Sequence, residues 1–108
     1  MEIEEYAEWA RRAGGEETTA EASDAHVAIL AFSLLGDASE VGEVVKRRLR
    51  DGRFDRERLA YELSDVIYYW ARLCAVADVR PSMLLEQSRR SIEERLAKRA
   101  KPAAEPAQ

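Results

Sequence analysis

The chain has 108 residues, which is enough for one domain with a single core. Hydrophobic residues make up 46% and charged residues 35%, with 5 Gly and 3 Pro, so the composition excludes a disordered chain and favours helices. The net charge of −4 argues against binding a nucleic-acid polymer. The most apolar run, residues 27–35, is shorter than the about 20 residues that span a membrane. A single cysteine, Cys74, excludes an internal disulfide and a zinc site of its own, which favours a cytoplasmic location.

A first helix is predicted over residues 3–13, where apolar side chains recur at helical spacing and Gly14 and Gly15 end the pattern. Trp9 lies off this stripe. It is therefore either a partly exposed packing residue or a ring that stacks on a nucleobase. Residues 16–23 show no period and are expected to form a loop, able to act as a lid, before an N-cap at Ser23 or Asp24.

A long second helix is predicted over residues 24–50 with two faces. The expected core stripe is Val27, Leu30, Leu34, Ala38, Val41, Val45 and Leu49. The other stripe begins apolar and becomes acidic: Ile29, Phe32, Gly36, Glu40, Glu43 and Arg47. Because residues 27–35 are apolar nearly all round, a chain of this size cannot enclose them alone, and a subunit interface is expected there.

The third and fourth helices are predicted over residues 56–77 and 81–100, started by Asp55 as an N-cap and by Pro81 as the first helical residue. The third helix also has two stripes. Its expected core stripe is Leu59, Leu63, Val66 or Ile67, Trp70, Cys74 and Ala77, and its second stripe is Glu62, Asp65, Tyr69 and Arg72. Residues 1–100 thus form the predicted domain, and residues 101–108 a disordered tail.

Four carboxylates form two matching pairs, Glu40 with Glu43 and Glu62 with Asp65. Each pair is spaced i, i+3, so both members project from one helix face, and the pairs are nearly equidistant from a turn at Arg53. In an antiparallel hairpin the four acids would meet at one height, where a divalent metal would offset their repulsion. The alternative is that both pairs lie on solvated helix faces.

The donors are all oxygens, which suits Mg²⁺ or Mn²⁺ and suits zinc poorly. Mg²⁺ usually keeps waters and binds phosphate oxygens of a substrate. The pattern therefore indicates a helical site where the metal brings a polyphosphate to an activated water. Lys46, one turn beyond Glu43, is in reach of an anion held there.

Two segments resemble the MazG-like nucleotide pyrophosphohydrolases. Leu35-Gly36-Asp37-Ala38-Ser39-Glu40-Val41-Gly42-Glu43 is similar to the family's Gly-Leu-x-Gly-Glu-x-Gly-Glu helix, and Glu62-Leu63-Ser64-Asp65-Val66 is similar to its Glu-Leu-x-Asp-Val helix. The likeness covers about residues 3–99. It implies an all-α fold, a four-helix MazG-like bundle completed by oligomerisation as a homodimer or a homotetramer.

The resemblance also implies an activity. Members of the family are Mg²⁺-dependent house-cleaning hydrolases that convert nucleoside triphosphates, often deoxy or non-canonical, to the monophosphate and pyrophosphate. By carry-over, the metal ligands and catalytic acids would be Glu40, Glu43, Glu62 and Asp65. The substrate-binding residues would be Lys46 and Arg95 facing phosphate, Tyr69 holding the substrate and Trp9 touching the base.

This chain departs from the family pattern in two places. Asp37 and Ser39 stand where the family has Leu and Gly, and Ser88 and Ser91 stand where its fourth helix often has Asn and Lys. The serines favour a rival interpretation, a non-catalytic helical oligomer that binds a nucleotide or a partner. A plain structural bundle is a third interpretation.

Overall fold

The computed structural model describes residues 1–100, which form four helices and no strand: α1 (Ile3–Ala13), α2 (Asp24–Asp51), α3 (Arg56–Val76) and α4 (Pro81–Ala100). The prediction of an all-α fold is confirmed, and every helix boundary agrees with the predicted one to within one residue. No helix among these residues is long and apolar enough to cross a membrane. The predicted disordered tail, residues 101–108, lies outside the described residues.

The helix ends follow local signals in the sequence. The Ser23 hydroxyl accepts a hydrogen bond from the His26 backbone N–H (3.2 Å), and the Asp55 carboxylate accepts one from the Arg58 backbone N–H (2.9 Å). Both therefore satisfy N–H groups that a helix start leaves unpaired. Gly52 ends α2 in the left-handed conformation (φ 72°), which glycine adopts without a steric penalty.

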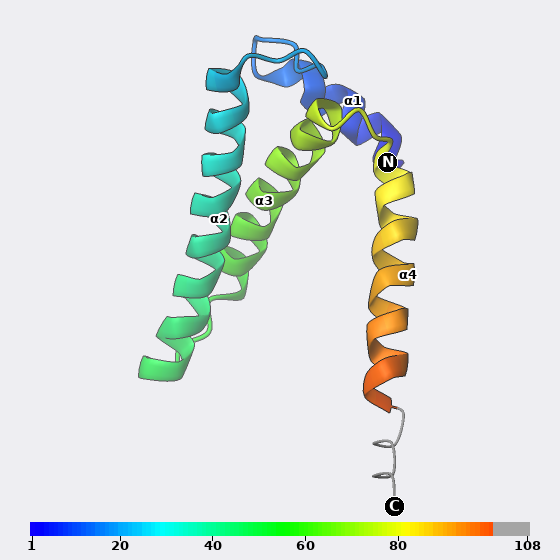
Figure 1. Ribbon diagram of the computed structural model, residues 1–108. Coiled ribbons are helices and arrows are strands. Elements are labelled where there is room, and N and C mark those ends of the chain that lie inside the picture. The colour runs from blue at the N-terminus through cyan, green and yellow to red at the C-terminus, as the bar shows by residue number, and fades with distance from the viewer. Residues whose placement is uncertain (101–108) are drawn as a thin grey trace, which may run out of the picture.

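The helices assemble as a hairpin with two additions. α2 and α3 run antiparallel side by side, α1 packs on α3, and α4 packs on α1 (Figure 1). α4 then runs apart from the hairpin along most of its length (Figure 1). Its start is held by Glu4 of α1, whose carboxylate accepts a hydrogen bond from the Ser82 N–H (3.0 Å). A helix in one part of the chain is thus capped by a side chain from another part.

One chain encloses only a small core. The fully buried apolar residues are mostly small: Ala10, Leu30, Val44, Ala71 and Cys74. Cys74 is buried as predicted, and burial raises the pKa of its thiol. The radius of gyration is 18.3 Å, well above the about 13 Å of a compact domain of 100 residues. A single chain therefore does not close into a bundle, and the predicted bundle completed by a second copy stays a prediction.

The side of α2 that faces α3 differs from the predicted core stripe. Leu30, Asp37 and Val44 follow one another at intervals of seven residues. Leu30 and Val44 are buried, and Asp37 is half-buried. Three expected core positions of the second half are exposed instead: Ala38, Val45 and Leu49. Two helices packed along their length repeat their contacts every seven residues, or about 3.5 per turn, whereas a straight helix has about 3.6 residues per turn. A stripe predicted with the 3.6 period therefore drifts away from the partner helix.

The predicted core stripe of α3 is right in part: Cys74 is buried and Leu59, Val66 and Trp70 are half-buried. Leu63 and Ile67, expected in the core, are 50% and 45% exposed, whereas Glu62 and Arg72 of the other stripe are each only 3% exposed. The packed side of α3 therefore includes the second stripe as well as part of the apolar one. This brings carboxylates to the packed side of the molecule.

Candidate metal centre

Three carboxylates converge where α2 and α3 face each other. Asp37 comes from α2, and Glu62 and Asp65 come from successive turns of α3. Each offers one oxygen, and these three oxygens all lie within 4.8 Å of one another. Glu62 is buried, while Asp37 and Asp65 are half-buried. We refer to these three residues as the acidic cluster.

The acidic cluster is short of positive charge. Arg58 donates from Nε to Glu62 Oε1 at 2.8 Å, and among residues 1–100 this is the one ion pair that any member of the cluster makes. The pKa of Asp37 is raised by burial, by the charge of Asp65 and by the charge of Glu40. Repulsion among the carboxylates is therefore only partly offset within the chain.

The donor set fits a hard divalent cation. Ligand oxygens on opposite sides of a Mg²⁺ ion lie about 4.2 Å apart, because each bond is about 2.1 Å long. No two of the three oxygens in the acidic cluster are more than 4.8 Å apart, so they are near enough to share one ion. Oxygen ligands without His or Cys favour Mg²⁺ or Mn²⁺ over zinc.

Glu40 and Glu43 are not members of the acidic cluster. Both are exposed, and the Glu43 carboxylate lies 3.9 Å from the Lys46 ammonium on the outer side of α2. Glu40 borders the cluster, since its charge acts on the pKa of Asp37. Of the four acids predicted to meet, the structure thus brings together Glu62 and Asp65, and it adds Asp37.

Sequence reasoning missed Asp37 because it used helical spacing alone. Equal distance from the turn gives the height of a residue along the hairpin but not the direction in which its side chain points. Asp37 lies seven residues from both Leu30 and Val44, and this repeat is the signal that places it towards α3. The assignment of Glu40 and Glu43 as metal ligands stays a prediction.

Four aromatic rings form a chain of contacts from α1 to α3. Trp9 and Tyr6 of α1 have ring centroids 5.6 Å apart, Trp9 lies 5.9 Å from Tyr68, and Tyr68 lies 5.0 Å from Tyr69. Burial raises the pKa of Tyr6, with contributions from Tyr68 and Asp65, so this ring lies within electrostatic range of the cluster. Trp9 is 57% exposed, which leaves part of its ring available for stacking.

The predicted phosphate-facing cations lie elsewhere. Lys46 is exposed beside Glu43. Arg95 lies on α4, where it lines a hollow of about 320 Å³ together with Ser88, Ser91 and Trp70. Because α4 packs on α1 rather than along the hairpin, one chain does not bring Arg95 to the acidic cluster.

Arg72 fastens α1 and the following loop to α3. Its guanidinium is buried and donates to the carbonyl oxygens of Ala10 (2.6 Å) and Glu16 (3.1 Å) and to the Tyr68 hydroxyl (3.2 Å). A Cβ atom on Gly14 would lie 2.9 Å from Arg72 Nη1. The guanidinium can occupy this position because glycine has no side chain there. Sequence analysis placed Arg72 on the acidic stripe but gave no sign of this role.

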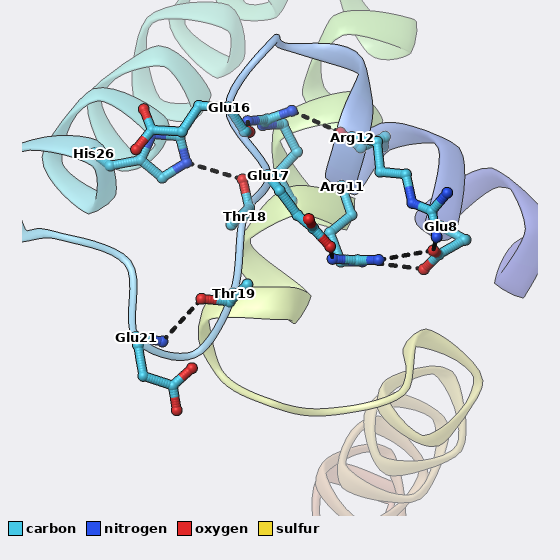
Figure 2. A network of polar contacts seen from close by, with 11 residues as sticks. Glu8, Arg11, Arg12, Glu16, Glu17, Thr18, Thr19, Glu21 and His26 are labelled. Carbon is cyan, nitrogen blue, oxygen red and sulfur yellow. Dashed lines mark hydrogen bonds and ion pairs between the residues drawn. The ribbon is translucent and has the colours of Figure 1, made fainter.

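The loop between α1 and α2 is held by side chains at several points (Figure 2). Thr18 is fully buried, and its Oγ1 lies 2.9 Å from His26 Nε2. The other ring nitrogen of His26 lies 3.3 Å from a Glu16 oxygen. Arg11 pairs with both Glu8 and Glu17. The loop that was expected to act as a lid is therefore held in place by these side-chain contacts.

The Thr18 hydroxyl, the His26 imidazole and the Glu16 carboxylate follow the order of a catalytic triad. Thr18 is buried, however, so a substrate cannot reach its hydroxyl.

Comparisons of the chain with protein-family models, with curated proteins and with solved structures find no match in any of the three. The resemblance seen in the two acidic segments therefore stays a prediction.

Proposed function

We propose that the chain is a Mg²⁺-dependent nucleoside triphosphate pyrophosphohydrolase, which converts a (deoxy)nucleoside triphosphate to its monophosphate and pyrophosphate. The observation that carries the proposal is the acidic cluster, three carboxylate oxygens from two helices within 4.8 Å of one another. The similarity of the two acidic segments to MazG-like helices supports the same reaction. A cytoplasmic location, with Mn²⁺ as a substitute metal, accompanies this proposal.

The cluster residues would hold the cation through oxygens of Asp37, Glu62 and Asp65. When bound, Mg²⁺ offsets phosphate charge and lowers the pKa of a coordinated water. Arg58 holds the Glu62 carboxylate in place through its 2.8 Å contact. Glu40 is exposed and its charge acts on the pKa of Asp37, so its carboxylate would be the group that accepts a proton from an attacking water.

The aromatic rings supply a surface for the base of the nucleotide. Trp9 presents a half-exposed ring, and the rings of Tyr6 and Tyr68 both pack near it. Tyr69 follows Asp65 by about one helix turn and its ring lies 5.0 Å from that of Tyr68, so it would contact the substrate. Stacking on such rings accepts any base, so it supports nucleotide binding without selecting one nucleobase.

A second copy of the chain would complete the enzyme. Large apolar side chains are exposed on the outer face of α2 and along α4: Ile29, Phe32, Leu35, Leu85, Ile92 and Leu96. Residues 24–45 of α2 carry four acids and no lysine or arginine, whereas α4 carries five cations against three acids. The outer face of α2 in one chain and α4 in another are therefore both apolar and opposite in charge, which favours packing between two copies. Arg95 would then reach a phosphate from the other copy.

A second candidate function is nucleotide binding without hydrolysis. The observation that favours it is the hollow on α4, where Ser88 and Ser91 leave Arg95 as the one cation among the lining residues. Weak phosphate binding there would give a sensor rather than an enzyme.

The proposed function is tested by incubating the protein with a panel of nucleoside and deoxynucleoside triphosphates in Mg²⁺. The proposal predicts monophosphate and pyrophosphate as products, and their absence after removal of Mg²⁺ with a chelator. Nucleotide binding without any product would support the sensor instead. Release of orthophosphate would point to a different phosphatase reaction and contradict the proposal.

A further inference from the structure

A cavity of about 250 Å³ lies at the turn between α2 and α3, separate from the acidic cluster. It is lined by Val44, Arg47, Asp51, Arg53, Asp55 and Arg58. Three of these six residues are arginines, contributed by the end of α2, the turn and the start of α3. The volume is below the roughly 300–1,000 Å³ of clefts that hold drug-sized ligands, which suits a small ligand.

The end of the hairpin around this cavity is strongly basic. Residues 46–58 contain seven lysines and arginines and three acids, a net charge of +4 in a chain whose total is −4. The guanidinium groups of Arg48 and Arg56 also lie over the Phe54 ring, 4.5 and 4.8 Å from its centroid. These contacts hold two further cations at the same end of the hairpin.

The acids that line the cavity already have partners. Both carboxylate oxygens of Asp51 accept from Arg50 at 3.1 Å, and the Asp55 carboxylate caps α3 through the Arg58 N–H. Within residues 1–100, Arg47 and Arg53 make no ion pair with any carboxylate. The cavity therefore offers guanidinium donors that the described chain does not neutralise.

We propose that this cavity binds a small phosphate-bearing anion. The planar fork of a guanidinium group matches two oxygens of a phosphate, and arginines from different elements can surround one anion. Arg47 and Arg53 supply the uncommitted donors. Arg58 uses Nε for Glu62 and keeps its terminal nitrogens for the anion. Binding would also relieve the repulsion among the cations at this end of the hairpin.

Arg58 places the anion next to the acidic cluster without making it part of that cluster. One guanidinium group separates the cavity from the Glu62 carboxylate. The anion site needs no metal and no hydrolysis, so it does not depend on the proposed function. Two sources have the required chemistry, a free inorganic anion and the phosphate chain of a nucleotide.

The test is isothermal titration calorimetry of the full chain with pyrophosphate, in a chelator that removes divalent metals and at fixed ionic strength. Binding is expected, and Arg53→Gln and Arg47→Gln are each expected to weaken it about tenfold or more, because each removes charge-assisted hydrogen bonds. Arg90→Gln on α4 makes the same charge change outside the cavity and should leave the affinity unchanged. Circular dichroism verifies that each variant is folded.

A nucleoside triphosphate titrated under the same conditions separates the two sources. Tighter binding than pyrophosphate identifies the nucleotide chain, and weaker binding identifies a free anion. The proposal is overturned if pyrophosphate does not bind, or if both cavity variants bind it as the unmodified chain does. An Asp65→Asn variant should keep this binding, so a failure of the metal centre and a failure of the anion site give different results.

Discussion

Asp37 on α2 and Asp65 on α3 bring carboxylate oxygens within 4.8 Å of each other across the helical hairpin. Asp65 is also one of the charges that raise the pKa of Asp37. Two acids held this close destabilise the metal-free protein, and a divalent cation removes the penalty. The relationship therefore links the stability of the hairpin to its ability to bind a metal.

Asp37→Asn should stabilise the metal-free protein at pH 7. The folded-state pKa of Asp37 lies above its ordinary value, so the charged form disfavours folding and the protonated form does not. The gain in melting temperature should shrink as the pH falls toward 3.8, the ordinary value for this group. Thermal melts in a chelator across this range measure it, with Glu86→Gln on α4 as a control. A loss of stability at pH 7 would contradict the account of repulsion.

Gly14→Ala should destabilise the protein although the backbone there suits any residue (φ −81°). The new Cβ would lie 2.9 Å from Arg72 Nη1, and Arg72 is held by two carbonyls and a hydroxyl. We expect a loss of about 1–3 kcal/mol by urea denaturation, as for other overpacked sites. The matched control is Gly36→Ala in α2, where nothing lies within 4 Å of the new atom. That change should stabilise the protein by up to about 1 kcal/mol. Equal effects at both glycines would show that Arg72 is not fixed.

Acidification should loosen the start of α4. Hydrogen bonds from Ser82 lower the pKa of Glu4 below its ordinary value of 4.5. The contribution of Glu4 is therefore present above that value and is lost as the pH falls through the lowered pKa. Glu4→Gln should give faster amide exchange at Ser82 and Met83 already at neutral pH, with Glu5→Gln on the same turn as the control. Unchanged exchange in Glu4→Gln would mean that the cap does not hold α4.

Phe32→Glu should disrupt self-association. Phe32 is 71% exposed on the outer face of α2, where a second copy is proposed to pack. A charge buried in such an interface lacks a partner and is costly. Sedimentation velocity at micromolar concentration should show an oligomer for the unmodified chain and monomers for the variant. Ala20→Glu in the loop before α2 makes the same change in charge and should remain oligomeric. A monomeric unmodified chain would contradict the proposal of a second copy.

The helices could be predicted from sequence because residues near their ends cap them through short-range contacts. Ser23, Asp55, Gly52 and Pro81 act through groups within a few residues, so no knowledge of the fold is needed to read them. The direction in which each helix faces is not local. Asp37 faces α3 together with Leu30 and Val44, which lie seven residues to either side of it, and Glu62 is buried on α3. Which face of each helix is covered depends on how the two helices pack together.

The same limit explains the residues that tie the elements together. Arg72 binds carbonyls 62 and 56 positions away along the chain, and Glu4 caps a helix that begins 77 positions later. Spacing within one helix contains no information about such contacts. The acidic pair Glu62 and Asp65 was found because its two members share one helix, whereas its partner on α2 was assigned to Glu40 and Glu43 instead of Asp37.

The central claim, that the acidic cluster binds a divalent cation through Asp37, Glu62 and Asp65, is tested most directly by Mn²⁺ binding measured by electron paramagnetic resonance. The unmodified chain is expected to bind Mn²⁺, which Mg²⁺ displaces, and Asp37→Asn and Asp65→Asn should each weaken binding about tenfold or more. Glu43→Gln, outside the cluster, should have a small effect. Absence of Mn²⁺ binding, or unchanged binding by Asp37→Asn, would contradict the claim.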